Sequence, residues 1–447
     1  MAASTTPNIL DCVQSACRPI TGSSTDYDSL LESIGDARVV LLGEASHGTH
    51  QFYQSRAHIT QRLILEKGFS AIAVEADWPD AWRVNRYVQS DSTDQDALQS
   101  LSGFKRFPAW MWRNVDVLEF IAWLRGHNDS LQQPNRIGFY GLDIYSLHGS
   151  MECVLHYLDS TDPDAAHRAR DRYACFDRFG ENPQSYGYAA GLGLHPSCEN
   201  EAVSQLVDLQ RNALLHTRMP GLIPLDNFFD AEQNARVVKD AEKYYRAMFG
   251  DSTSSWNLRD QHMMETFVAL DEHLTLPQSQ AKMIVWAHNS HIGDARATTM
   301  GQAGEWNIGQ LARQKYGAAC RSIGFSTYSG TVCAATDWDG PVERKQVQPA
   351  RPDSYEAFLH SIGIPAFSLC LQHDSPAARA LLEPMRERAI GVIYRPDSEL
   401  ASHYFHASLS AQFDAILHFD QTSAVQPLDL VADPANGEPD ETFPSGL

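Results

Sequence analysis

Short runs of branched apolar residues alternate along this chain with amphipathic stretches of helical length. The run "ARVVLLGE" (37–44) is followed by "HQFYQSRAHITQRLILEKG" (50–68), and the run "FSAIAVEA" (69–76) by "DAWRVNRYVQ" (80–89). Such alternation is typical of βα units, in which a crossover helix brings two strands together in parallel. The sequence therefore predicts an α/β fold with a mostly parallel sheet flanked by helices.

Five more apolar runs extend the predicted sheet to seven strands: 136–143, 281–288, 320–328, 389–396 and 413–420. Residues 148–275 are mostly helical in pattern, so we expect a large helical insertion that forms a lid or wall over the carboxyl ends of the strands. The predicted organisation is an N-terminal extension (1–25), one α/β domain (26–430) and a flexible tail (431–447) that is too polar and rich in Pro and Gly to fold alone.

Charge, targeting segments and cysteine spacing each narrow the possible partners and location of the protein. The formal net charge of −21 disfavours nucleic acid and anionic membranes. The first residues do not resemble a secretory signal, and no run of 18 apolar residues occurs. The 8 cysteines form no CxxC pair, which favours reduced thiols and a cytoplasmic location. The sequence leaves the oligomeric state open.

Ionisable residues follow the ends of several predicted strands. Glu44, Glu75, Asp143 and His288 each end a run, while His47 and His291 follow within three residues. Open parallel sheets bind ligands at the carboxyl ends of their strands, so these side chains should meet at one rim. Any one of them could merely cap a helix or fix a loop, but burying the whole set is costly unless its members pair, which favours a functional site.

The segments around these residues resemble the signature blocks of the erythromycin esterase family. The blocks are "LLGEASHGTHQFYQSRAHIT", "AVEADWPDAWRVNRYV", "GLDIYSLHGS" and "VWAHNSHIGDARA", with further similar blocks at 107–114, 328–341 and 389–405. The resemblance implies a hydrolase that opens ester or macrolactone bonds with activated water and forms no acyl-enzyme. By motif position it implies that His47 is the general base, and it places the family's other active-site positions at Glu44, Arg56, Glu75, His288 and His291.

The chemistry of these residue types fits ester hydrolysis independently of the resemblance. A general base needs a pKa near neutrality, and histidine is the side chain whose ordinary value lies closest. Glu44 or Glu75 can fix the tautomer of His47, as the carboxylate of a catalytic triad does. Arg56 can bind a substrate oxygen or pair with a carboxylate. His288 and His291 can polarise the carbonyl or protonate the leaving alcohol, although His291 could equally serve only at a helix terminus.

Aromatic residues near the rim indicate a bulky, partly apolar substrate. Core packing is the other interpretation of these rings. The predicted substrate is a small-molecule ester or lactone such as a macrolide. The candidate substrate contacts are Trp78, Trp110, Trp112, Arg113, Asp143 and Tyr145, with Trp82 as a further aromatic residue.

Other catalytic classes are less favoured. The chain has no G-x-S-x-G motif, which argues against a serine hydrolase despite Ser46 and Ser290. "HNSH" at 288–291 could contribute to a metal site, but it lacks the glutamate of H-E-x-x-H, and we predict no metal and no other cofactor. A metal-dependent hydrolase or peptidase, an acyl-transferring enzyme and a non-catalytic binding protein for natural products stay open as alternatives.

Overall fold

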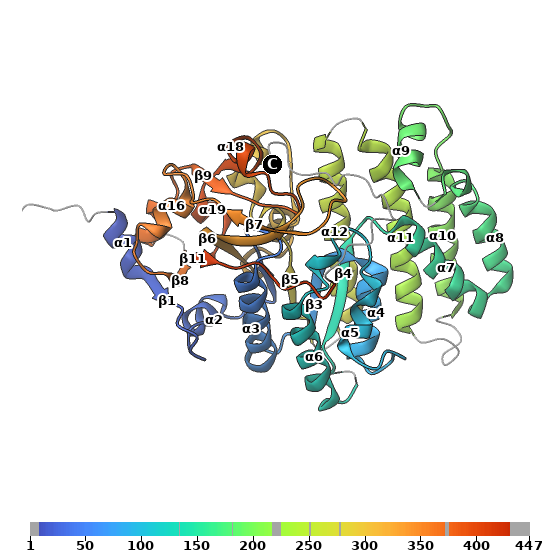
Figure 1. Ribbon diagram of the computed structural model, residues 1–447. Coiled ribbons are helices and arrows are strands. Elements are labelled where there is room, and N and C mark those ends of the chain that lie inside the picture. The colour runs from blue at the N-terminus through green and yellow to red at the C-terminus, as the bar shows by residue number, and fades with distance from the viewer. Residues whose placement is uncertain are drawn as a thin grey trace, which may run out of the picture.

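The computed structural model describes residues 9–133, 135–180, 182–216, 225–249, 252–276, 279–371 and 375–429. The tail predicted at 431–447 lies outside these residues. The described strands form a mixed, mostly parallel sheet, and helices cover both of its faces, as predicted (Figure 1). The helical segment lies beyond one edge of this sheet and contributes one long helix to the rim.

The main sheet has nine strands among the described residues, in the order β1-β8-β11-β6-β2-β5-β3-β4, with β7 also paired to β6. Pairs between β11, β6, β2, β5, β3 and β4 are parallel, whereas β1, β8 and β7 pair antiparallel. The strands span Cys17–Pro19 (β1), Val39–Leu42 (β2), Ala71–Asp77 (β3), Gly138–Asp143 (β4), Met283–Trp286 (β5), Cys320–Ala334 (β6), Glu343–Val347 (β7), Ala366–Cys370 (β8) and Ala415–Thr422 (β11).

One predicted strand is wrong. Residues 389–396 form an irregular segment that makes only single bridges, Ile390 to Ser46 and Ile393 to Ala335. A buried loop and a buried strand carry the same apolar residues, so composition did not separate them. The sequence also missed β1, β7 and β8, and a separate two-stranded sheet made of Met385–Arg388 (β9) and Tyr404–Ala407 (β10).

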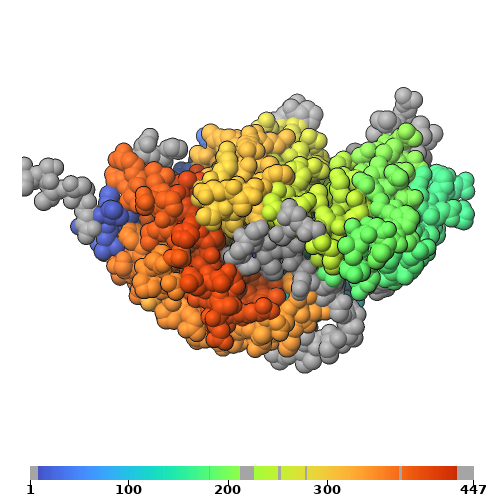
Figure 2. Space-filling model, turned by 90° about the horizontal axis from the view of Figure 1, so that it is seen from above, coloured from blue at the N-terminus to red at the C-terminus, as the bar shows by residue number. Residues whose placement is uncertain are grey.

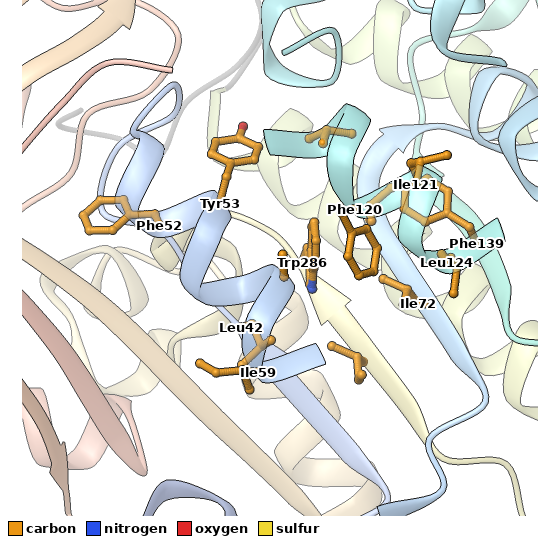
Figure 3. Close-up of a cluster of buried hydrophobic side chains, with 14 of the residues drawn as sticks. Leu42, Phe52, Tyr53, Ile59, Ile72, Phe120, Ile121, Leu124, Phe139 and Trp286 are labelled. Carbon is orange, nitrogen blue, oxygen red and sulfur yellow. The ribbon is translucent and has the colours of Figure 1, made fainter. Parts of the chain in front are cut away.

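The central strands are buried on both faces, and alternate residues enter two different hydrophobic clusters. Val40 and Leu42 of β2 pack into one cluster, and Val39 and Leu41 pack into the other. Figure 3 shows part of the first cluster, where Trp286 of β5 packs among side chains of the covering helices. Burial on both faces explains why these strands read as continuous apolar runs.

Helices α3 (His50–Lys67), α4 (Trp78–Val88) and α6 (Val115–Asp129) contribute to the first cluster. The α3 helix ends at Lys67 and is followed by Gly68, whose φ of 70° is left-handed; the next N–H, that of Phe69, donates to the Leu63 carbonyl at 3.2 Å, a glycine C-cap. The α6 helix begins at Asn114, whose side chain accepts a hydrogen bond from the Val117 N–H. Helix α3 begins at His50, directly after the loop that carries His47.

The helical segment consists of Leu147–Thr161 (α7), Pro163–Tyr173 (α8), Pro183–Gly191 (α9), Glu199–His216 (α10), Leu225–Ala247 (α11) and Ser252–Leu274 (α12). In Figure 1 it stands beside the β4 edge, and in Figure 2 its green part forms a lobe at one end of the molecule. Helix α12 returns from this lobe and packs against β4 and the second hydrophobic cluster. The insertion thus contacts the sheet through α12, and its role as a lid or wall stays a prediction.

The remaining described helices are short or peripheral: Ile9–Ala16 (α1), Asp28–Ile34 (α2), Ala97–Ser100 (α5), Asn289–Ile292 (α13), Thr299–Gln302 (α14), Ile308–Tyr316 (α15), Tyr355–His360 (α16), Pro376–Ala380 (α17), Glu399–Ser402 (α18) and Leu409–Gln412 (α19). No helix in the described parts of the chain has the length and apolar character needed to cross a membrane.

The prediction of reduced thiols is wrong for one pair of cysteines. Cys175 and Cys198 form a disulfide within the helical lobe. They are 23 residues apart in sequence, so no short motif marks the pair. Cysteine spacing therefore gives no support for a reducing compartment.

Candidate active site

The strand register brings the predicted rim residues to one level. Leu42 of β2 pairs with Trp286 of β5, and Val74 of β3 pairs with the same Trp286. Glu44 and His288 each lie two positions beyond their strand, and the Asn289 N–H donates to the Glu44 carbonyl at 2.8 Å. Parallel pairing therefore places Glu44, Glu75 and His288 side by side at the carboxyl ends of three adjacent strands.

The loop that carries His47 is fixed by backbone hydrogen bonds on both sides. The His47 N–H donates to the Ile390 carbonyl at 3.0 Å, and the Gly48 carbonyl accepts from Cys333 at 3.1 Å. Gly48 has a φ of 69°, and a Cβ there would lie 2.4 Å from the Cys333 carbonyl oxygen and 2.7 Å from the Trp110 ring. Only glycine fits this position, so the turn holds the histidine in one place.

His47 contacts a buried carboxylate, which in turn pairs with a buried arginine. Its Nδ1 lies 2.8 Å from Glu44 Oε1, and Arg56 Nη2 donates to Glu44 Oε2 at 3.1 Å. The side chains of Glu44 and Arg56 are 2% and 0% exposed. A buried carboxylate needs such a paired cation to stay charged. The arrangement favours the His47 tautomer with its proton on Nδ1 and its lone pair on Nε2.

Glu75 lies at the centre of the rim and has several donors. Its Oε1 lies 2.9 Å from Arg259 Nη2, 3.2 Å from His291 Nε2 and 4.0 Å from His47 Nε2. Its Oε2 accepts the His288 backbone N–H at 2.8 Å. Burial alone would raise the pKa of Glu75, but His291 and Arg259 outweigh it and hold the pKa well below its usual range. Glu75 is therefore an anion at neutral pH.

His291 is the cationic member of the cluster. Its Nδ1 lies 2.9 Å from Asp260 Oδ2 on α12, and the Trp256 ring stacks on it with centroids 4.5 Å apart. Burial opposes the charge, yet the carboxylates of Asp260 and Glu75 raise the pKa of His291 to about 9. The imidazolium is thus present across the neutral range and neutralises part of the surrounding negative charge.

His288, in contrast to His291, is neutral. Burial, and then the nearby His47, keep the pKa of His288 well below its ordinary value. Its Nδ1 lies 2.8 Å from Ser290 Oγ and accepts the Ser290 N–H at 3.3 Å, which places the ring proton on Nε2. Within the described residues this Nε2 has no hydrogen-bond partner. The His47 and His288 rings lie 4.8 Å apart between centroids.

A cavity of about 470 Å³ opens above this cluster. His47, Glu75, His288 and His291 line its floor, together with Arg259. Its lining residues are His47, Glu75, Trp256, Arg259, His288, Ser290, His291, Asp337, Trp338, Ala389, Gly391, Ile393, Arg395, Ser402 and His403. The lining residues from Asp337 to His403 belong to the orange and red segments, which Figure 2 shows on the face seen from above.

The predicted substrate contacts lie outside this cavity. Trp78 packs against Trp82 and Tyr140 and donates to Asp230 at 2.8 Å, while Arg113 pairs with Asp429 near the surface. Trp78 therefore belongs to the core and Arg113 lies near the surface, and contact of either residue with a substrate stays a prediction.

The other four contacts lie behind the floor. Asp143 makes two hydrogen bonds to Arg259, and the Tyr145 ring lies 5.0 Å from the same guanidinium. Trp112 and Asp143 line a much smaller cavity of about 30 Å³. Trp110 is buried beneath Gly48. These residues support the cluster, and direct substrate contact by them stays an untested prediction.

Sequence reasoning missed the residues that α12 supplies. Trp256, Arg259 and Asp260 lie at positions i, i+3 and i+4 of one helix and therefore share a face. That spacing of an aromatic, a cation and a carboxylate was the available signal. Trp338 and Arg395 were also missed, although both lie in segments that the sequence singled out as family-like blocks.

The ionisable groups of the rim pair mostly with one another: His47 with Glu44, and His291 with Asp260 and Glu75. In the parts of the chain that the structure describes, no group of three or more His, Cys, Asp or Glu side chains is arranged to hold a metal ion. The arrangement offers a carboxylate-oriented imidazole, an ionised glutamate and fixed cations around one cavity, which suits attack by water on a polar bond.

Comparison with known proteins yields several matches. The family model described as erythromycin esterase matches residues 64–422. The erythromycin esterase type II of Escherichia coli is 24% identical over 417 residues, covering 89% of this chain and 93% of that protein. Among solved structures, a Bacillus cereus protein has a TM-score of 0.74 at 22% identity, covering 94% and 98% of the two chains. A mutant of the erythromycin esterase EreC in its open conformation has a TM-score of 0.63 at 18% identity, covering 91% and 96%.

Proposed function

Since the chain belongs to the erythromycin esterase family and is a carboxylic ester hydrolase, we propose that it opens a small-molecule ester or lactone with water activated by His47. The observation that carries this proposal is the position of His47 between a buried carboxylate and the cavity. Glu44 holds Nδ1 at 2.8 Å, and Nε2 belongs to the cavity floor beside Glu75. This is the geometry of a histidine general base.

The reaction proceeds by direct attack. A water molecule hydrogen-bonded to His47 Nε2 gives its proton to that nitrogen as its oxygen bonds to the ester carbonyl carbon. The 4.0 Å between Nε2 and Glu75 Oε1 allows one water to contact both groups. The tetrahedral intermediate then expels the alkoxide, which takes the proton back from His47. An ester gives one acid and one alcohol, a lactone gives one hydroxy acid, and no acyl-enzyme forms.

The surrounding groups stabilise the charge that develops. His288 is neutral and carries a proton on an unpaired Nε2 in the described structure, so it can donate to the carbonyl oxygen as that atom becomes negative. Arg259 and His291 hold Glu75 ionised from the opposite side. Fixed donors in a buried site act strongly because they need no reorganisation during the reaction.

The cavity walls support a compact, partly apolar substrate. A volume of about 470 Å³ lies within the usual range for small-molecule sites. Trp256, Trp338 and Ile393 offer apolar surface, whereas Asp337 and Arg395 stand as a polar pair at 2.6 Å. The family's name makes a macrolide lactone the first substrate to test, followed by smaller lactones and esters.

One contact favours a second candidate, a serine nucleophile. Ser290 lines the cavity and its Oγ lies 2.8 Å from His288 Nδ1. Among the residues that the structure describes, no carboxylate orients this imidazole, since Glu75 accepts the backbone N–H of His288 and not a ring proton. The contact between Ser290 and His288 is also a local one, because the two residues are only two positions apart at the start of α13. The His47 mechanism is therefore the better supported of the two.

The proposal is tested by screening purified protein on a panel of esters and lactones, with mass spectrometry of the products. On the best substrate, His47→Ala should lower kcat by about 10² to 10⁴ with little change in KM. His262→Ala is the matched control, because His262 is buried and paired with Asp240 at 2.9 Å but does not line the cavity. Full activity in His47→Ala would overturn the proposal.

A cytoplasmic location stays a proposal. The disulfide between Cys175 and Cys198 removes the support that the cysteines had lent to it. Fractionation of the native host, with detection of the chain in each fraction, decides the location.

A further inference from the structure

The guanidinium of Arg56 is buried with most of its donors unused. The side chain is 0% exposed, and only Nη2 reaches Glu44, at 3.1 Å. In the described structure Nε and Nη1 have no hydrogen-bond partner. An unpaired buried donor ordinarily costs free energy, and a charged one costs more. Something other than hydrogen bonds must therefore compensate this cation.

Two aromatic rings lie against the guanidinium. Arg56 Cζ is 4.3 Å from the centre of the Tyr53 ring and 5.1 Å from the centre of the Trp286 ring. The electron-rich face of an aromatic ring attracts a cation, and the attraction is largest in a site without water. Trp286 is itself fixed, because its Nε1–H donates to Thr60 Oγ1 at 2.9 Å.

The two rings lie close to the rim but not on the cavity. Tyr53 belongs to α3 and Trp286 to β5, and Figure 3 shows both on one side of α3 while Phe52 points away from them. Neither lines the cavity of about 470 Å³. Burial, followed by the nearby Glu44, raises the pKa of the Tyr53 hydroxyl well above its usual value, so the ring carries no charge.

We propose that Tyr53 and Trp286 are positioning residues for the hydrolysis: their ring faces enclose the Arg56 guanidinium and fix the direction from which it holds Glu44, and through Glu44 the His47 ring. The inference rests on the proposed function, because it requires His47 to act in the reaction. The planar guanidinium fits between ring faces in a way that the compact ammonium of lysine does not.

Single substitutions at Tyr53 separate the ring from the hydroxyl. Tyr53→Leu removes the ring face and should lower kcat about 10- to 50-fold, the loss of a desolvated cation–π contact, with KM within about twofold. Tyr53→Phe keeps the ring and should restore kcat to within about threefold of the parent. Phe52→Leu is the matched control. Phe52 is the residue before Tyr53 and is also fully buried, but it packs on Phe325 and Phe419 and not on Arg56.

A double-mutant cycle with Arg56 gives the decisive result. If Tyr53 acts through Arg56, then Tyr53→Leu should cost less than about threefold in kcat once Arg56→Met is present, because the cation it orients is gone. Thermal melting checks that each variant is folded. Should Arg56→Met not fold, Arg56→Gln serves as the background, since it removes the positive charge but keeps an N–H donor for Glu44.

Three outcomes would overturn the inference: a normal kcat in Tyr53→Leu, equal losses in Tyr53→Leu and Phe52→Leu, or effects of Tyr53 and Arg56 that multiply in full. These differ from a failure of the proposed function. Full activity in His47→Ala would overturn the general-base mechanism, whereas an inactive His47→Ala beside a fully active Tyr53→Leu would overturn the positioning role alone.

Discussion

Asp260→Asn should change the pH dependence of the reaction more than its rate at low pH. Asp260 and Glu75 together raise the pKa of His291 to about 9 against the effect of burial. Asparagine keeps a hydrogen-bond acceptor at 260 but removes one of the two negative charges. Loss of an opposite charge within a few ångströms lowers a histidine pKa by about 1 to 3 units, so His291 in the variant should titrate near pH 7.

The expected size of the effect follows from these two values. At pH 8 about nine-tenths of His291 is protonated in the parent, compared with about one-tenth in the variant. The imidazolium holds Glu75 ionised at 3.2 Å, so kcat at pH 8 should fall about tenfold. At pH 6 both forms of the enzyme keep a charged His291, and their kcat values should agree within about threefold.

The assay is kcat and kcat/KM from pH 5.5 to 10 on one ester substrate. The alkaline limb should move to lower pH by about two units in Asp260→Asn. Asp240→Asn is the control, because Asp240 also pairs with a buried imidazole, that of His262 on α12, at 2.9 Å and that pair lies away from the cavity. A uniform loss of activity at every pH, with no movement of the limb, would refute the assigned role of the His291 charge.

Three further results are expected. Glu75→Gln should lower kcat by about 10² or more, because a neutral amide leaves Arg259 and His291 without their shared anion, and a kcat within tenfold of the parent would contradict this. Ser290→Ala should lower kcat by less than about tenfold, since the serine is not the nucleophile; complete inactivity would favour the serine mechanism. Folded-state stability should depend on His291: its pKa is raised to about 9, so its stabilising contribution is complete below about pH 6.5 and is lost as the pH rises through 9. Thermal melting should therefore show a decline between pH 7 and 10 that is smaller in His291→Gln.

The parallel core of the fold was predictable because its signal is local. The runs that became β2, β3, β4 and β5 are buried on both faces, so their apolar residues are continuous in sequence and end where the strands end. The same rule correctly predicted that Glu44, Glu75 and His288 share one rim. Strand β7 escaped notice for the opposite reason: it is the charged, largely exposed segment "ERKQV", which carries no apolar run.

Other parts of the site are built from contacts between residues far apart in sequence, which no local sequence pattern predicts. Arg259 reaches Glu75 across 184 positions of the chain, and its partner Asp143 across 116. The sequence alone does not distinguish tryptophans of the core from tryptophans that line the cavity, because both environments favour an indole ring. Trp78 thus entered the core, whereas Trp256 and Trp338 line the cavity.

The central claim is that water activated by His47 attacks the ester directly. The most direct measurement is a single turnover with enzyme in excess over substrate in ¹⁸O-water, quenched at intervals and followed by mass spectrometry of both the product acid and the intact protein. The account predicts one ¹⁸O atom in the acid from the first turnover and no acyl adduct on the protein at any time. An acyl adduct on Ser290, or an unlabelled acid with ¹⁸O transferred to Glu75 or Glu44, would contradict it.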